Sequence, residues 1–451
     1  MSQLTASITD SVVFADLFGT RAMRAIFTDR ARVQRCLDVE LALARVQARL
    51  GIIPAEAAAE INRHGGAESY DLDKLGAGTV RAGSPIVPIV NALVARCANG
   101  HGEWAHWGAT TQDIMDTAMV LQMRDALALV SEDLATIRAG LADLAKRHRD
   151  VPMAGRSNLQ HAIPITFGYK AAVQLSAFQR HAERLDQLKS RLLVGEFGGA
   201  VGTLASLGAQ GLAVQQGLCA ELGLAQPVIA WHVARDTVAE CGQFLALLTA
   251  SCAKLALDVR LLMQTEVAEA FEPFQAGRGS SSTMPQKRNP VAGNFVHACA
   301  SLVRNLAATL TEAMVQDHER ATGPFQMEWA AVPEIFCLAS GALSHCAGLA
   351  QGLVIDPARM RQNLDMTGGL LLSEAVMMGL GPVLGRQVAH DLVYDICREV
   401  AQGHGGFLDL LCANEQISAQ MTRDQLAALL DPGAYTGLAG VMVDRVLARE
   451  G

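Results

Sequence analysis

The sequence is poor in the residues that other folds use for strands and for nucleic-acid contacts. Aromatic residues make up only 5% of its 451 residues although half are hydrophobic, so Ala, Leu, Val and Met supply the apolar surface. Alternating Val, Ile and Thr with Asn-Gly or Asp-Gly turns, the pattern of hairpin strands, is nearly absent. The net charge is −8 and no block of basic residues occurs, which argues against nucleic acid as a partner.

Metal-binding and secretory patterns are also missing. The ten cysteines, from Cys36 to Cys412, include no C-x-x-C pair, and the twelve histidines include no zinc spacing such as H-E-x-x-H. We therefore expect reduced, buried thiols, no metal and no cofactor. The first residues lack a basic segment followed by a long apolar run, so they do not form a secretory signal. These absences favour a cytoplasmic protein.

One apolar stretch, residues 368–385, approaches the length of a membrane span. It contains Glu374, Pro382 and several glycines, which a span would accommodate poorly. We therefore predict a buried helix of a soluble protein and no membrane partner.

Long helical segments dominate what is present. Residues 115–150 contain no proline, and their apolar positions recur every three or four residues, as in a helix. Residues 237–272 and 291–320 follow the same period. Rods of about 30 residues, roughly 45 Å long, bury their apolar faces by bundling, often between subunits. We predict a mostly α fold with an N-terminal helical domain over 1–110, a central long-helix bundle over 111–350 and a C-terminal helical domain over 351–451.

Three polar loops interrupt the rods, at residues 106–117, 155–168 and 277–290. We place each at the end of a long helix, where unpaired backbone N–H groups favour anions. The third, GRGSSSTMPQKRNP, is not a Walker A phosphate loop, because Gln286 precedes Lys287 and Arg288 follows it.

The third loop has the residue types needed to bind a carboxylate. Serine N–H groups, with Lys287 and Asn289 nearby, suit that group and also the dianion formed when a proton leaves the carbon beside it. A serine in this setting is a candidate base. A flexible surface loop is the alternative reading.

This loop resembles the signature of the fumarase/aspartase superfamily, G-S-x-x-M-x-x-K-x-N. Ser281, Met284, Lys287 and Asn289 are in register, and Ser280 replaces the leading glycine. The other two loops resemble the superfamily's other active-site regions, and the likeness covers nearly the whole chain. It implies a three-domain homotetramer with a core of twenty helices and active sites built from three subunits. It also implies Ser281 as the catalytic base, with Lys287 and Asn289 on the substrate carboxylate.

Within the superfamily the chain looks most like the cycloisomerases that lactonise 3-substituted muconates. The superfamily's usual acid is the histidine of an R-T-H triplet, which reads Arg156-Ser157-Asn158 here. A carboxylate leaving group, whose conjugate acid has a pKa of about 4, does not need that acid. The open alternatives are a muconate with another substituent such as a sulfonate, a fumarate-releasing lyase of the adenylosuccinate type, and an inactive structural relative.

The remaining polar residues of these regions receive individual predictions. His161 is the second catalytic candidate, as an orienting group or as a replacement for the missing acid, and a packing role is its alternative. Asp116 is expected to be structural, as a cap or as the partner of a base. Arginines suit a polycarboxylate substrate, and Arg278 is one further candidate. His106 and the two threonines have helix capping as an alternative role. The substrate-binding candidates are His106, Thr110, Thr111, Arg156, Asn158, Gln160, His232, Arg235, Lys287, Asn289 and Arg320.

Overall fold

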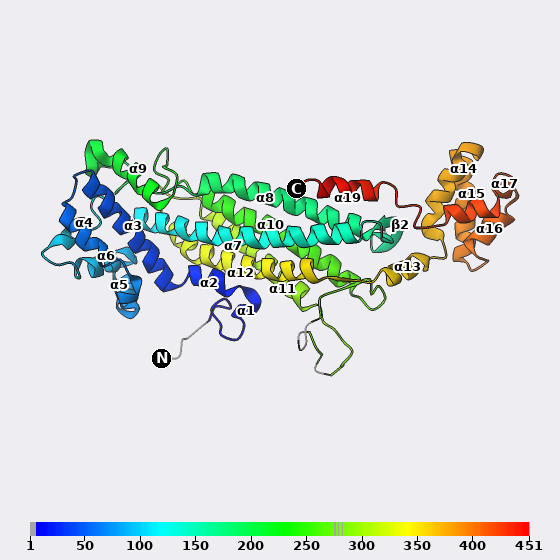
Figure 1. The fold of residues 1–451 in the computed structure, drawn as a ribbon, viewed down its shortest axis with the longest axis horizontal. Coiled ribbons are helices and arrows are strands. Elements are labelled where there is room, and N and C mark those ends of the chain that lie inside the picture. Colours follow the sequence, from blue (N-terminus) through cyan, green and yellow to red (C-terminus); the bar gives the residue numbers. More distant parts are fainter. Residues whose placement is uncertain (1–5, 275–276, 278, 282, 451) are drawn as a thin grey trace. The chain divides into compact units, whose positions relative to one another are not determined.

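Helices form nearly all of the fold, which confirms the predicted mostly α class (Figure 1). The computed structural model describes residues 6–274, 277, 279–281 and 283–450. The longest helices are α3 (Asp29–Arg49), α7 (Thr111–Arg147), α8 (Phe167–Leu192), α10 (Asp236–Leu262), α11 (Val291–Glu312) and α12 (Pro324–Gly352).

Shorter elements connect and flank these helices. The short helices are α1 (Ala15–Phe18), α2 (Arg21–Ile26), α4 (Ala55–Asn62), α5 (Leu72–Ala82), α6 (Ile86–Val94), α9 (Gly211–Leu222), α13 (Pro357–Asp365), α14 (Ser373–Leu384), α15 (Arg386–Ala401), α16 (Phe407–Ala413), α17 (Glu415–Ser418), α18 (Arg423–Leu429) and α19 (Ala439–Leu447). The 3-10 turns are η1 (Ala67–Ser69), η2 (His101–Trp104), η3 (Ala205–Gln210) and η4 (Leu370–Leu372). The strands are β1 (Pro152–Ser157), β2 (Gln160–Thr166), β3 (Ala270–Phe271) and β4 (Val354–Ile355).

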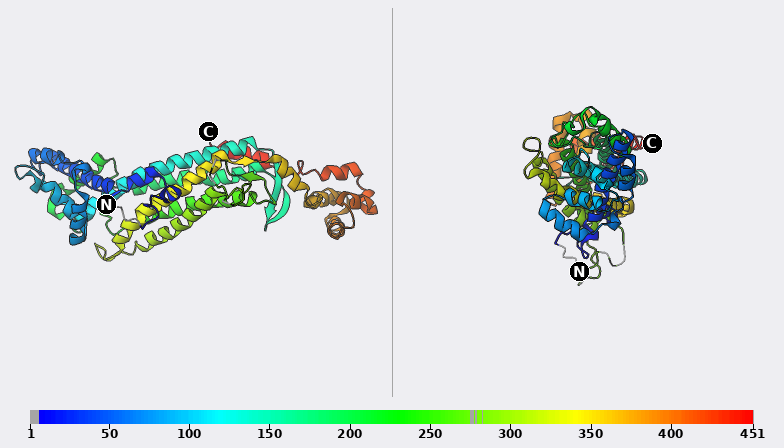
Figure 2. Two further views of the ribbon diagram at one scale, coloured as in Figure 1. Left: turned by 90° about the horizontal axis from the view of Figure 1, so that it is seen from below. Right: turned by 90° about the vertical axis from the view of Figure 1, so that its left-hand side faces the viewer.

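Contacts divide the chain into two compact units, each made of three separated stretches. Unit 1 comprises Met1–Leu134, Arg180–Ala253 and Phe295–His345, and unit 2 comprises Ala135–Gln179, Lys254–Asn294 and Cys346–Gly451. Helices α7, α8, α10, α11 and α12 contribute residues to both. Figure 2 draws the same ribbon from two further sides.

Glycines let the long helices approach closely within each unit. In unit 1, a Cβ added at Gly242 of α10 would lie 2.7 Å from the Leu310 side chain of α11. In unit 2, a Cβ at Gly140 of α7 would lie 2.7 Å from the backbone of Ala350 in α12. The small residues that dominate the composition therefore act at the helix contacts.

The hydrophobic core of unit 1 positions the segment that leads into α7. Leu37 and Leu43 of α3, Ile61 of α4 and Ile114 of α7 are at most 1% exposed. Trp104, Ala105, Ala109 and Met115 pack against the same core. The polar residues between Ala105 and Met115 are thus held in place by apolar residues that pack on the core on both sides of them.

The predicted rods exist, but their ends differ. Helix α10 ends at Leu262, ten residues before the predicted end, because the chain turns and forms β3, which pairs with β4. Helix α11 ends at Glu312 instead of at 320. The apolar period continues beyond Leu262, so periodicity alone does not record where pairing with a distant strand stops α10.

The second predicted loop lies between the ends of two long helices, α7 and α8, as predicted, but it forms a β-hairpin instead of a loop. Strand β1 pairs antiparallel with β2, with Ser157 opposite Gln160. Asn158 and Leu159 turn the chain with φ values of +50° and +63°. Positive φ at both central residues is what a type I′ hairpin turn requires, and asparagine tolerates it well. Asn158 therefore has a conformational reason to be in the turn.

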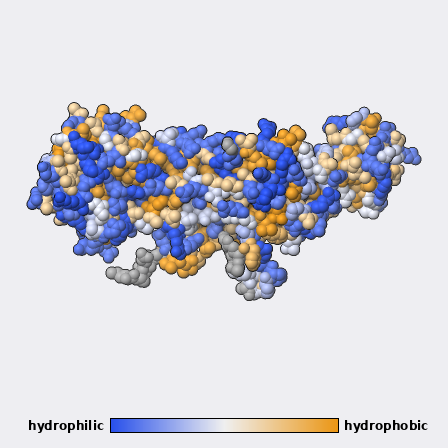
Figure 3. Space-filling model, in the orientation of Figure 1, coloured by the Kyte–Doolittle hydropathy of each residue, from blue (hydrophilic) through white to orange (hydrophobic). Residues whose placement is uncertain are grey.

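Helix α12 is long and apolar enough to cross a membrane, but 72% of its most apolar window is buried inside the protein. The segments Pro357–Asp365 and Leu370–Leu384 pass the same test only together, with an 81° bend between them. Figure 3 shows hydrophilic residues intermixed with hydrophobic patches on the face it draws. All ten cysteines are free; seven are buried, as predicted, but Cys97, Cys397 and Cys412 are only partly buried.

Candidate active site

Asp113 organises the first predicted active-site region, in unit 1. It lies in the first turn of α7 and is 0% exposed. Its Oδ2 accepts hydrogen bonds from the N–H groups of Thr110 (2.8 Å) and Gly199 (3.0 Å), and its Oδ1 accepts one from Gly198 (2.8 Å). The bond from Thr110 forms half of a capping box. One carboxylate therefore fixes both the start of α7 and the glycine turn at 198–199.

Arg320 reaches the same glycine turn. Its Nη2 donates to the Gly199 carbonyl oxygen at 2.8 Å. Burial lowers the pKa of Arg320, while the nearby carboxylates Asp113 and Glu196 raise it. Arg320 thus brings a cation to the turn that Asp113 holds.

His106 is held by a buried acid. Its Nδ1 lies 2.6 Å from Glu40 Oε1, and the Glu40 side chain is only 1% exposed. Burial lowers the pKa of His106, but the hydrogen bond and charge of Glu40, with the charge of Asp113, raise it further, so the net direction is upward. With partly buried Thr110 and Thr111, His106 supplies donors for an anion.

His232 and Arg235 lie in the interior of unit 1. His232 is 2% exposed, and its Nε2 lies 2.7 Å from Asp113 Oδ1. The Arg235 side chain is 0% exposed; its Nη atoms donate to Asp116 at 2.8 and 2.9 Å, and its Nε donates to Glu328 at 3.0 Å. The prediction that Asp116 pairs with a base is confirmed. Arg235 was predicted to bind substrate, but it has no exposed atom with which to do so, because two buried carboxylates pair with its guanidinium.

Asp113, Glu196 and His232 form a buried cluster with ligand atoms within 4.8 Å of one another, a spacing that a metal ion would accept. Hydrogen bonds already engage most of these atoms, since Glu196 Oε2 accepts the N–H of Trp231 and Asp113 is occupied as described. Glu196 Oε1 has no hydrogen-bond partner in the described part of the chain and lies 3.6 Å from His232 Nε2. Burial raises the pKa of Glu196 to about 8. A neutral carboxyl in a hydrogen-bonded cluster fits a structural role better than a metal site.

Glu196→Gln should stabilise the protein, and by more at pH 8.5 than at pH 5. In the folded protein the carboxyl keeps its proton up to about pH 8, whereas in the unfolded chain it ionises near its ordinary pKa of 4.5. Unfolding between these values releases a proton, so wild-type stability falls as pH rises through that window. Glutamine cannot ionise and loses this dependence. Thermal melts at pH 5, 6.5 and 8.5 measure it, with exposed Glu312→Gln as the control. A Tm difference that stays constant with pH would contradict the assignment.

In unit 2, the hairpin places Arg156 against a buried acid. Its Nη1 and Nη2 donate to Glu269 at 2.8 and 2.6 Å, and the Asn363 amide donates to the same carboxylate at 2.7 Å. The Glu269 side chain is 0% exposed. This fork-to-fork pairing occupies most of Arg156, so the residue serves chiefly to anchor the hairpin.

His161 stands opposite Arg156 in the hairpin. Burial lowers the pKa of His161, and the charge of Arg156 lowers it further, against the smaller effect of Glu269. Its Nδ1 is buried and has no hydrogen-bond partner among the described residues. A neutral imidazole is a poor proton donor, which argues against His161 as a replacement for the missing acid. Asn158 and Gln160 are exposed at the turn.

The signature loop, also in unit 2, presents Ser281 differently from its neighbour. Ser281 Oγ accepts hydrogen bonds from the N–H groups of Thr283 (3.3 Å) and Met284 (3.0 Å). Ser280 Oγ instead donates to the Gly277 carbonyl at 3.4 Å. N–H groups directed at an oxygen stabilise its anionic form. Of these two serines, only Ser281 has backbone N–H groups directed at its side-chain oxygen.

Lys287 and Asn289 lie on the return of the loop. The N–H and the side-chain amide of Asn289 both donate to Gly279 O, at 2.9 and 3.1 Å, and a bridge joins Ser280 to Arg288. Lys287 is exposed. Glu272, just before the loop, accepts hydrogen bonds from the N–H groups of Ala292 and Gly293 at the start of α11. These bonds hold the two ends of the loop together. Arg278 and Ser282 lie outside the described residues.

The structure groups the predicted residues into two sets, one in each unit. Sequence reasoning missed the buried acids that position them, Glu40, Asp113, Glu196, Glu269 and Glu328. Asp113 could have been found from the sequence, because a threonine before a helix with an acid three residues later is a capping pattern. The others left none, since their partners are distant in the chain.

Family comparisons assign the class of protein. A family model described as lyase matches residues 19–304, and one described as adenylosuccinate lyase C-terminus matches residues 369–446. The chain therefore belongs to the lyase family, that is, to the fumarase/aspartase superfamily.

Individual relatives span nearly the whole chain. It is 49% identical over 435 residues to "Trans-aconitate decarboxylase 1" of Mycosarcoma maydis, covering 96% of this chain and 88% of that protein. It is 47% identical over 439 residues to the "3-carboxy-cis,cis-muconate cycloisomerase" of Pseudomonas aeruginosa, covering 97% and 96%. The crystal structure of the 3-carboxy-cis,cis-muconate lactonizing enzyme from Pseudomonas putida superposes with a TM-score of 0.91 at 43% identity, covering 96% and 97%.

Proposed function

We propose that the protein is a cycloisomerase that lactonises 3-carboxy-cis,cis-muconate to 4-carboxymuconolactone, a step in protocatechuate degradation through the beta-ketoadipate pathway. The observation that carries the proposal is the pair of N–H groups directed at Ser281 Oγ in a loop that also contains Lys287 and Asn289. The relatives named for this reaction, at 43–47% identity, support it.

Ser281 performs the proton transfer in this mechanism. A substrate carboxylate oxygen adds to the conjugated double bond, and the displaced electron pair moves to the carbon beside a second carboxylate. Ser281 delivers its hydroxyl proton to that carbon, and the Thr283 and Met284 N–H groups stabilise the alkoxide left behind. Lys287 and Asn289 stabilise the charge that accumulates on the second carboxylate.

The absence of the superfamily's histidine fits this reaction. In the reverse direction the leaving group is a carboxylate, which departs without protonation. Asn158 serves the hairpin turn, and the lowered pKa of His161 keeps the imidazole neutral, so neither residue supplies a strong acid. Amine elimination would need one. His106, Thr110, Thr111, Gln160 and Arg320 bind the remaining carboxylates.

A direct substrate comparison tests the proposal. Purified enzyme should turn over 3-carboxymuconate, followed by loss of its ultraviolet absorbance, faster than 3-sulfomuconate, adenylosuccinate or trans-aconitate. Decarboxylation of trans-aconitate is the second candidate function, because a relative at 49% identity bears that name and trans-aconitate is also an unsaturated tricarboxylate. Carbon dioxide release from trans-aconitate, without turnover of 3-carboxymuconate, would replace the first function by the second.

The enzyme is proposed to be a cytoplasmic homotetramer whose active sites draw on several subunits. Exposed apolar side chains on α10 and α11, namely Leu247, Leu257 and Leu302, support burial against other chains. A mixture of Ser281→Ala and His106→Ala subunits should then regain activity that neither variant has alone, because some mixed sites receive both intact residues. Activity is measured after unfolding and joint refolding, with separately refolded variants as controls. Verified mixed tetramers without activity would count against shared sites.

A further inference from the structure

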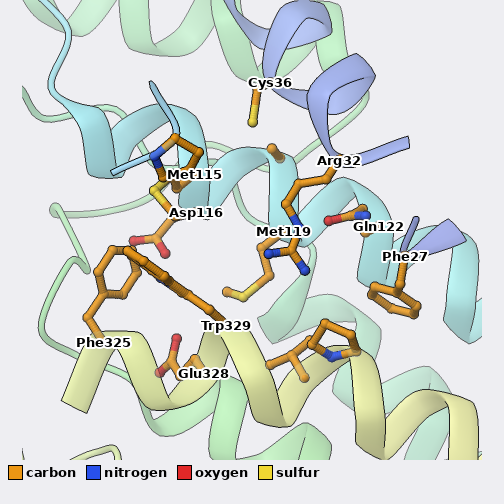
Figure 4. A pocket seen from close by; sticks show the side chains of 14 residues that line it. Phe27, Arg32, Cys36, Met115, Asp116, Met119, Gln122, Phe325, Glu328 and Trp329 are labelled. Atoms are coloured by element: carbon orange, nitrogen blue, oxygen red, sulfur yellow. The ribbon is translucent and has the colours of Figure 1, made fainter. Parts of the chain in front are cut away.

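Two hydrogen-bond donors that lack acceptors among the described residues lie in unit 1, beside the first two turns of α7. Arg32 of α3 and Trp329 of α12 line a cavity of about 40 Å³ together with Phe27, Met119 and Phe325. Figure 4 shows the Arg32 guanidinium extending from α3 toward Met119 and Trp329. The predicted catalytic and substrate-binding residues are not among those that line this cavity.

Both polar groups lack acceptors. The Arg32 guanidinium, which is partly buried, makes no hydrogen bond or ion pair with any residue that the structure describes. The indole Nε1 of Trp329 is buried and likewise has no partner in the described part of the chain. A buried donor without an acceptor costs about 1–3 kcal/mol, and this cost applies to Trp329 Nε1, since Arg32 is only partly buried. An occupant with two acceptor atoms would remove that cost and would also pair with the Arg32 guanidinium.

The acids nearby do not fill this role. Asp116 and Glu328 line the same cavity, but both are bound to the Arg235 guanidinium. Burial raises the pKa of Glu328, while the hydrogen bond and charge of Arg235 lower it. Cys36 is also present, and burial raises the pKa of its thiol to about 12, so it remains neutral. An incoming anion therefore meets the Arg32 guanidinium, while Asp116 and Glu328 share the single charge of Arg235.

The dimensions suit the head group of a small acid. A volume of about 40 Å³ holds a few water-sized groups, enough for a carboxylate but not for a whole organic acid. Two larger hollows, of about 280 and 590 Å³, share Arg32 and Trp329 among their lining residues and offer room for a body. We propose that Arg32 and Trp329 bind the carboxylate of a small organic acid. The apolar body of this acid occupies one of the two adjoining hollows.

Benzoate is the probe that tests this site, and benzamide is its uncharged counterpart. Calorimetric titration of the intact protein should show benzoate binding and much weaker binding of benzamide. Arg32→Met should weaken benzoate binding about 10-fold or more, because it removes a charge-assisted pair, and Trp329→Phe about 2- to 10-fold, because it removes one N–H. Arg81→Met, at an exposed position of α5, is the matched control and should bind as wild type does.

The remaining outcomes separate the site from its alternatives. Equal binding of benzoate by wild type and Arg32→Met, or equal binding of benzoate and benzamide, would overturn the proposal. Trp329→Phe keeps an aromatic ring and so reports on the donor even if Arg32→Met folds poorly. Competitive inhibition of turnover by benzoate would identify the acid as part of the substrate, and non-competitive inhibition as a separate effector; both require Arg32. Ser281→Ala should lose turnover but bind benzoate as wild type does. Failure of the proposed reaction and failure of the proposed benzoate site can therefore be told apart.

Discussion

Ser281→Ala should lower kcat by about 10²- to 10⁴-fold, the usual contribution of general acid–base catalysis. The hydroxyl is the group that the Thr283 and Met284 N–H donors surround, and alanine leaves those donors in place while removing the transferable proton. KM should change little, because the hydroxyl acts mainly in the transition state. Steady-state kinetics with 3-carboxymuconate measures both constants.

Ser280→Ala is the matched control for this variant. Its hydroxyl donates to the Gly277 carbonyl and has no N–H groups directed at it, so the variant should retain most of the activity. An inactive Ser280→Ala enzyme beside an active Ser281→Ala enzyme would show that the register of the signature loop is wrong.

Arg235→Met should destabilise the protein by about 3–5 kcal/mol, because it leaves two buried carboxylates without their cation. Asp116 and Glu328 are each 1% exposed, so water cannot take over the role of the guanidinium. Chemical denaturation measures the loss. Arg81→Met, at an exposed position, should stay within about 0.5 kcal/mol of wild type.

Restoring neutrality should recover part of that loss. The triple variant Arg235→Met, Asp116→Asn, Glu328→Gln carries no buried charge at these positions, so it should be more stable than Arg235→Met alone. If the triple variant is no more stable, lost packing against Trp231, which lies 4.8 Å from the guanidinium, explains the defect instead of charge.

The helical class and the signature loop were readable from the chain because their signals are local. Apolar residues spaced three and four apart specify long helices wherever they pack, and the loop residues from Ser281 to Asn289 are consecutive. The hairpin at 152–166 was not readable, because its turn, Asn158-Leu159, lacks the glycine that usually marks one.

The sequence by itself determined the helical class, the family and the identity of the proton-transfer candidate, since each rests on residues close together in the chain. Tertiary structure decided which basic residues are free to act. Arg156, His232 and Arg235 read as substrate ligands, yet Glu269, Asp113 and the pair Asp116–Glu328 occupy them. Arg32, by contrast, has no such partner among the described residues. Burial makes the difference, because an acid removed from water must take a nearby cation, and no local pattern records which distant residues folding brings together.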